Sequence, residues 1–444
     1  MSSLGMFILL IVLIGSFIAY VKLSTKKAKK ENKETWLMRS WKKDSTKSVA
    51  SSLISILCGM LVGCVILLIS YLGKIANGSD IYFSDVINGI QLLFLTLFNT
   101  GNAIELRFTF NTINFGNMLF NATPLILTGL SVALAFKTGL FNIGAPGQYL
   151  VGTAASLIIS LSIPSTILPV WLIWTLAFLG AILAGAIWGL VPGLFKSLFN
   201  VNEVITCIMM NWIAANFVTS LFGKSFRNLL DPSGTKNWKF VYKTTHNGVA
   251  TNKMGLDVLF KESQVNGGII IAILIAILVY IMLNKTTFGY ELKACGSNKN
   301  AAKYAGINEK RSIILSMMIA GGLAGAGAAL YYLAGNTEFS WSTYESLPAV
   351  GFNGIPAALL AVSNPIGVIF SALFMAYLSV AGNIISGITE FSSEITNIIS
   401  AVIVYFSAFA LVIKELLNNN KKRKKEKPLD VQSVVVSDTK EVSK

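Results

Sequence analysis

Residues 117–136 read NMLFNATPLILTGLSVALAF, twenty consecutive positions without an Asp, Glu, Lys or Arg. An α-helix of about 20 apolar residues is long enough to cross the hydrocarbon core of a bilayer. Eight further stretches lack charged residues, at 1–21, 48–73, 138–195, 204–223, 263–284, 312–337, 346–389 and 395–413. Because such stretches recur along the chain, the sequence predicts an all-α, polytopic transmembrane helical bundle.

Two of these stretches are too long for one helix, and each is divided by a proline-containing segment, at 164–169 and 364–365. We therefore expect 10 or 11 transmembrane helices, some of them interrupted, at 4–21, 51–72, 118–136, 139–162, 170–195, 203–222, 267–284, 312–334, 347–363, 366–386 and 396–414. The apolar segment 86–104 is interpreted as an external interfacial or re-entrant helix, because a span there would reverse every later loop.

Charge is scarce and unevenly placed. Only 13% of residues are charged and 54% are hydrophobic, whereas a soluble domain carries about 25% charged residues. Much of the net charge of +15 lies in 22–47 and 421–427, next to apolar spans. An excess of Lys and Arg beside a span is typical of cytoplasmic segments. This placement argues against nucleic-acid binding and predicts a multi-pass membrane protein with a cytoplasmic C-terminus.

The same pattern divides the chain into three parts. Residues 1–50 are expected to form an anchor helix and a basic cytoplasmic linker, and residues 51–417 the membrane domain. Residues 418–444 are polar and basic, which is typical of a disordered tail.

The sequence lacks the motifs of nucleotide-binding, acid–base and metal sites. The chain has no G-x-x-x-x-G-K-[ST] motif, whose backbone would cradle nucleotide phosphates. It has no cluster of Asp, Glu and His for acid–base or metal chemistry, and its four cysteines have no metal-ligand spacing. We therefore expect no catalytic residue, metal or cofactor, and an energy source in another subunit.

Residues 137–148, KTGLFNIGAPGQ, interrupt the apolar sequence with three glycines and a proline. A helix broken at membrane depth frees backbone groups that lipid cannot satisfy. We interpret the segment as a break beside a transport path, with Phe141, Asn142 and Gln148 as path residues. The alternative is a tight cytoplasmic turn with glycines chosen for packing.

Residues 202–213, NEVITCIMMNWI, place Asn211 and Trp212 two turns inside a predicted span. Both are candidate path residues. The alternative is that Asn211 joins two helices by hydrogen bonds, as intramembrane amides commonly do.

The segment 287–307, TFGYELKACGSNKNAAKYAGI, is flanked by basic residues and contains short helical patterns separated by glycine. It is either an ordinary cytoplasmic loop or a coupling helix that docks on a motor subunit through Gly289, Ala301, Ala302 and Gly306. A separate glycine-rich run, 321–329, predicts close helix packing through small residues.

These segments, in this order, resemble the ABC permeases of the branched-chain amino acid and simple-sugar superfamily, and most of all its nucleoside branch. The motifs are GLFNIGAPGQ at 139–148, NEVITCIMMNWIA at 202–214 and the segment ending AAKYAGI at 307. The resemblance covers roughly 51–415. Asn353 and Pro356, within the span expected at 347–363, depart from the family's usual small or apolar residues. The location that the resemblance implies is the bacterial plasma membrane.

The resemblance implies a passive half of a transport pore for nucleosides. Its implied partners are a second homologous permease, a separate ATP-binding cassette ATPase and a substrate-binding lipoprotein. Alternatives are a sugar or branched-chain amino acid permease on the same frame, a stand-alone ion-coupled carrier, and a membrane scaffold.

Overall fold

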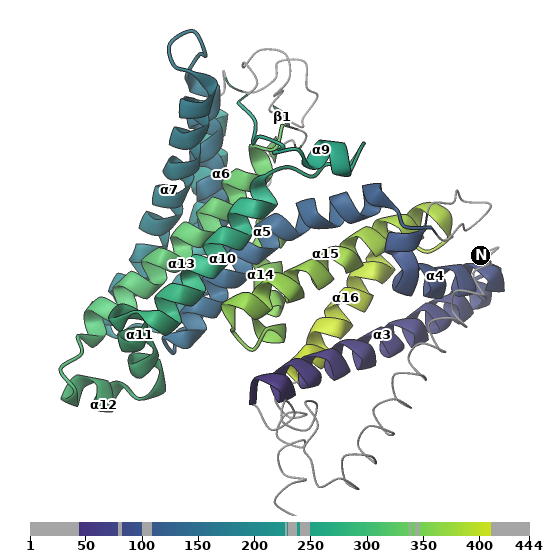
Figure 1. Ribbon diagram of the computed structural model, residues 1–444, viewed down its shortest axis with the longest axis horizontal. Coiled ribbons are helices and arrows are strands. Elements are labelled where there is room, and N and C mark those ends of the chain that lie inside the picture. The colour runs from purple at the N-terminus through teal and green to yellow at the C-terminus, as the bar shows by residue number, and fades with distance from the viewer. Residues whose placement is uncertain are drawn as a thin grey trace, which may run out of the picture.

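The helices of the protein lie side by side, as a computed structural model of the chain shows (Figure 1). It describes residues 44–78, 82–99, 109–226, 249–335 and 346–409, with 229, 238–239, 337 and 339–341 between them. The predicted anchor helix at 4–21 and the basic tail after 418 lie outside the described residues. They therefore stay predictions.

Seven described helices are long and apolar enough to cross a membrane, which confirms the polytopic helical bundle. Their spans are Leu57–Ala76, Thr112–Lys137, Val170–Phe199, Glu203–Ser225, Gly268–Lys285, Glu309–Tyr332 and Pro365–Ile388. They belong to α3 (Asp44–Ala76), α5 (Thr112–Lys137), α7 (Val170–Phe199), α8 (Glu203–Ser220) with the π-helical turn η2 (Leu221–Ser225), α10 (Gly268–Lys285), α13 (Glu309–Tyr332) and α15 (Pro365–Ile388).

Three further predicted spans form shorter or less apolar helices: α6 (Ala145–Ser162), α14 (Ala349–Leu360) and α16 (Ser393–Ala408). The predicted helix at 139–162 begins six residues late, because Gly139 adopts a φ of +71° that a right-handed helix excludes. The helix predicted at 347–363 ends at Leu360, because Val362 and Ser363 both have φ above +50°.

The segment predicted at 86–104 as interfacial or re-entrant forms α4 (Phe83–Leu95) and a 3-10 turn, η1 (Thr96–Phe98), in its described part. This helix is too short to span a bilayer. It packs against α3 and α15. Short elements complete the chain: α9 (Leu256–Leu259), α11 (Thr287–Ser297), α12 (Lys299–Tyr304), and the antiparallel pair β1 (Trp238–Lys239) and β2 (Ser340–Trp341).

Helix α13 lies at the centre of one group of helices and packs against α5, α6 and α7. The packing of α13 against α7 is close because glycines of α13 lie directly against the backbone of α7. An added Cβ at Gly321 would overlap the carbonyl oxygen of Gly185, and one at Gly325 would overlap that of Ala181. The glycine-rich run therefore serves close helix packing, as predicted. A second group, α3, α4, α15 and α16, shares its own apolar core.

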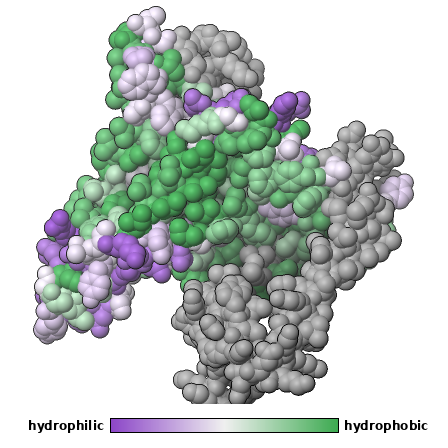
Figure 2. Space-filling view, viewed as in Figure 1, coloured by the Kyte–Doolittle hydropathy of each residue, from purple (hydrophilic) through white to green (hydrophobic). Residues whose placement is uncertain are grey.

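The two ends of the bundle are polar and its middle is apolar. Figure 2 shows hydrophobic surface over the bundle, with hydrophilic residues where α11 and α12 lie and around α9 at the opposite end. Helices α11 and α12 lie near the ends of α5, α7 and α10 and the start of α13. Ser197 of α7 donates to the Lys310 carbonyl of α13 at 3.2 Å, and Gly296 of α11 touches Lys137 of α5. The connections after Lys137 and Lys196 and the segment 285–311 thus share one end of the molecule.

Candidate functional site

A cavity of about 670 Å³ opens between α5, α13, α14, α15 and α16. Its volume is in the range of small-molecule binding sites. Among the described residues, no charged one lines it. Its polar wall consists of Asn121, Tyr331, Asn353, Ser379, Asn383 and Asn397, and its apolar wall of Pro124, Leu125, Ala349, Val350, Pro356, Met375, Gly382 and Ala401.

Helix α14 forms one wall of this cavity and packs very closely against α5. An added Cβ at Gly354 would lie 2.6 Å from the backbone of Thr128, and one at Gly129 would lie 3.3 Å from the Cβ of Ala357 in α14. The chain then turns sharply into α15, where Asn364 caps the new helix by accepting from the N–H of Ile366 at 3.0 Å. A left-handed conformation at the β-branched Val362 is strained, so this turn is held by the packing around it.

The amides of Asn353, Asn383 and Asn397 are the distinctive chemistry of the cavity. They come from three different helices and are exposed in this chain. Within the part of the chain that the structure describes, their side chains make no hydrogen bond. An amide both donates and accepts hydrogen bonds, so each of these side chains can pair with a ligand through its oxygen and its nitrogen. These three residues therefore suit a neutral, hydrogen-bonding ligand.

An aromatic surface adjoins these amides. Tyr331 lines the cavity, and its ring stacks on the buried ring of Phe120, with centroids 5.3 Å apart. The stack fixes the orientation of the Tyr331 ring beside the cavity amides.

The path residues predicted from sequence form a separate, buried cluster around the α5–α6 connection. Asn142 donates to Gln148 Oε1 at 2.8 Å and to Ser131 Oγ at 3.0 Å, and Gln148 donates back to Asn142 Oδ1 at 3.1 Å. Asn211 accepts from the N–H of Gly147 at 2.9 Å and donates to the Ile143 carbonyl at 3.0 Å. All three amides are thus paired with groups of the broken helix.

The two predicted aromatic path residues lie apart from that cluster. Phe141 is half-buried and stacks on Phe136 with centroids 5.0 Å apart. Trp212 is 52% exposed on the outer side of α8. None of the five predicted path residues lines the cavity, so a contact with substrate stays a prediction for each of them.

The predicted coupling segment, residues 287–307, forms two short helices, α11 and α12, at the polar end. Thr286 caps α11 by accepting from the Gly289 N–H at 3.1 Å, and Asn298 caps α12 by accepting from the Ala301 N–H at 3.1 Å. Of the four predicted docking residues, Gly289 and Ala302 are buried within the chain, whereas Ala301 and Gly306 are exposed.

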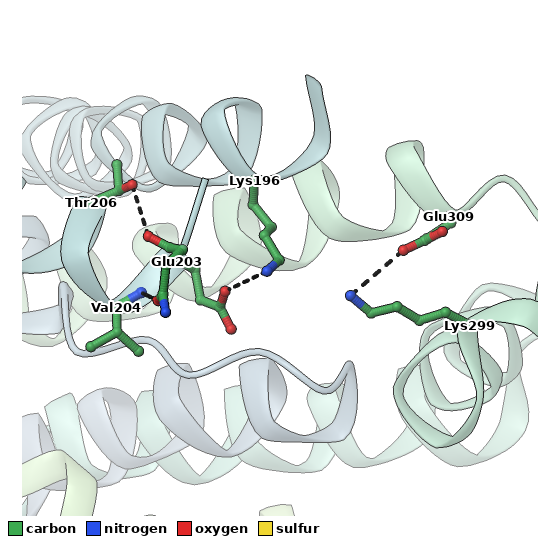
Figure 3. Close-up of polar contacts among 7 residues, drawn as sticks. Lys196, Glu203, Val204, Thr206, Lys299 and Glu309 are labelled. Carbon is green, nitrogen blue, oxygen red and sulfur yellow. Dashed lines mark hydrogen bonds and ion pairs between the residues drawn. The ribbon is translucent and has the colours of Figure 1, made fainter. Parts of the chain in front are cut away.

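Two ion pairs hold the helix ends around the coupling segment. Figure 3 shows Lys196 of α7 pairing with Glu203 of α8 at 2.9 Å, and Lys299 of α12 pairing with Glu309 of α13 at 3.6 Å. The second pair ties the coupling segment to the central helix. Surface pairs of this kind add little stability, so we interpret the second pair as setting the position of α12.

Sequence reasoning missed the cavity. It named Asn353 only as a departure from a family pattern, and it did not consider Asn121, Asn383 and Asn397. The available signal was a set of amides inside apolar stretches, at 353, 383 and 397. Only the fold shows that these positions face one another. Among the described residues, no group of three or more His, Cys, Asp or Glu could hold a metal ion.

Comparison with known proteins extends this picture. The family model for the permease component of branched-chain amino acid transport systems matches residues 114–408. The nucleoside ABC transporter permease protein NupB of Lactococcus lactis is 35% identical over 84% of this chain and 94% of its own. The guanosine permease NupP of Bacillus subtilis is 32% identical over 84% of this chain and 96% of its own.

A sugar transporter is also similar. The glucose ABC transporter permease protein TsgB13 of Haloferax volcanii is 30% identical over 66% of this chain and 76% of its own. No solved structure is significantly similar to the chain.

Proposed function

The chain belongs to the permease family of branched-chain amino acid transport systems, and we propose that it is the membrane subunit of an ABC importer for nucleosides. The observation that carries this proposal is the match to two nucleoside permeases along nearly their whole length. The helical bundle has the polytopic form that such a subunit needs.

The chemistry of the cavity supports a nucleoside as substrate. A nucleoside is neutral and carries hydrogen-bond donors and acceptors on both its base and its sugar. The amides of Asn353, Asn383 and Asn397 offer both functions. Tyr331, which also lines the cavity, adds an aromatic group that a planar base can contact.

The second candidate substrate is a simple sugar, which the similarity to a glucose permease favours. A sugar would use the amides equally well but would gain less from an aromatic group. A branched-chain amino acid fits less well, because the described lining of this cavity has no charged side chain to pair with its ammonium and carboxylate groups.

The partners follow from the family and from the shape of the site. The amides of the cavity are exposed in the single chain, as expected of half a pathway that a second, homologous permease completes. We propose that a separate ATPase docks on α11 and α12 and that a lipoprotein delivers substrate at the opposite end. The basic residues of 285–311 then lie in the cytoplasm, as does the C-terminus.

The test is uptake of radiolabelled guanosine, adenosine and uridine by cells with and without this gene, in a strain lacking other nucleoside transporters. Ribose, glucose and leucine serve as competitors. We expect nucleoside uptake to need the gene and to resist these competitors. Uptake that glucose or ribose suppresses would instead assign the protein to sugars.

A further inference from the structure

The coupling segment touches the α5–α6 connection without any side chain between them. An added Cβ at Gly296 of α11 would lie 2.8 Å from the backbone nitrogen of Gly139, and closer still to the carbonyl oxygen of Lys137. Gly139 itself has a φ of +71°, so it too favours glycine. Because backbone meets backbone here, a displacement of α11 acts directly on the end of α5.

Beyond that contact, buried hydrogen bonds hold the α5–α6 connection in one conformation. Asn142 and Gln148 exchange two hydrogen bonds, at 2.8 and 3.1 Å, across the turn that leads into α6. Asn142 also accepts from the Gly144 N–H at 3.1 Å. All of these groups are buried, where close packing transmits displacement instead of absorbing it.

The start of α6 in turn touches the wall of the cavity. An added Cβ at Gly351 of α14 would lie 2.8 Å from the nitrogen of Pro146. The neighbouring Val350 lines the cavity, and so does Asn353, half a turn further along the helix. A shift of Pro146 therefore acts on the helix that carries a cavity amide.

From these contacts we propose that motion of α11 and α12 is transmitted through the α5–α6 connection to α14, with Gly296 and Gly351 as positioning residues. The inference rests on the proposed function, because it assigns the route by which ATP hydrolysis outside the membrane changes the cavity. A physical route of this kind needs direct evidence of coupling, which is the purpose of the experiment.

The experiment uses the whole complex, purified with its partner subunits and reconstituted in proteoliposomes. ATP hydrolysis and uptake of radiolabelled guanosine are measured together for Gly296→Ala and Gly351→Ala. The matched control is Gly73→Ala in α3, where an added Cβ would meet no atom within 4 Å. If the wild-type complex does not take up guanosine, the proposed function fails, and the relay is judged with whichever substrate the complex does transport.

We expect both variants to hydrolyse ATP as the wild type does, with an unchanged KM for substrate. Substrate transported per ATP should fall by about tenfold, a typical size for coupling between two sites. Should either glycine variant fail to assemble, Asn142→Ala takes its place, because it removes these buried hydrogen bonds without adding volume, and the same fall is expected. A wild-type ratio in the assembled variants, or a raised KM with an unchanged ratio, overturns the relay.

Discussion

Asn211 of α8 accepts a hydrogen bond from the backbone N–H of Gly147, 2.9 Å away at the start of α6. Its amide nitrogen donates to the Ile143 carbonyl on the other side of the same break. A single side chain thus satisfies two backbone groups that the interrupted helix leaves without partners. The close fit of Gly147 to the Asn211 backbone, with a would-be Cβ 2.9 Å from its Cα, keeps the two helices in register.

Replacing Asn211 with Leu should therefore destabilise the protein. The buried N–H of Gly147 would lose its partner, at a cost of about 1–3 kcal/mol, and the partly buried Ile143 carbonyl would lose its partner as well. We expect a lower melting temperature in a fluorescence size-exclusion thermal assay. The control is Asn216→Leu on the same helix, since the Asn216 side chain only binds its own helix, at the Trp212 carbonyl. Equal melting temperatures for the two variants would contradict this role.

The cavity amides should behave in the opposite way. Asn353→Ala and Asn383→Ala remove exposed side chains that bind nothing else in the described chain, so melting temperatures should stay unchanged. Loss of one hydrogen bond to substrate, worth about 1 kcal/mol, should raise the KM for guanosine by about fivefold.

The control for the cavity is Ser386→Ala on α15, where the hydroxyl donates to the Asn383 carbonyl of its own helix at 3.1 Å. Its KM should match that of the wild type. If guanosine uptake by the two asparagine variants is also unchanged, the substrate does not pass along this wall.

The contrast between these two sets of amides shows how far the sequence could lead. Periodicity and charge placement predicted the spans, because a bilayer imposes a length and a polarity on every crossing. Asn142, Gln148 and Asn211 could be recognised as a group because they stand beside a visible break in the helix. Whether a buried amide meets another amide or a substrate depends on packing between distant segments, which no local pattern encodes.

The same limit explains the missed cavity and the shortened α14. Asn121, Asn353, Asn383 and Asn397 come from four helices, and each taken alone is an ordinary intramembrane amide. The end of α14 depends on left-handed backbone at Val362 and Ser363, two residue types that give no sign of it. The described structure adds what the sequence lacks, namely which of these positions share a space.

The interface between α7 and α13 offers a prediction with a control one residue away. Gly321→Ala would place a Cβ against the carbonyl oxygen of Gly185, whereas Gly322→Ala would place one at an ordinary 3.4 Å from Ile182. Overpacking of this kind costs about 1–3 kcal/mol. We expect a lower melting temperature for Gly321→Ala than for Gly322→Ala. Indistinguishable melting curves would show that the two helices separate easily.

Docking of the ATPase should depend on the exposed side of the coupling segment. Ala301 is exposed and Tyr304 is 94% exposed, whereas Ala302 is buried at 3%. Ala301→Glu and Tyr304→Glu should therefore abolish co-purification of the ATPase and guanosine uptake, while the permease still inserts and folds. Ala302→Glu would instead bury a carboxylate and lower the melting temperature of the permease itself.

The matched control is Val258→Glu on α9, an exposed apolar residue at the opposite end of the bundle, which should leave ATPase binding intact. Retained ATPase binding in Ala301→Glu and Tyr304→Glu would place the docking surface elsewhere, and loss of binding in Val258→Glu would show that this end of the bundle also influences assembly.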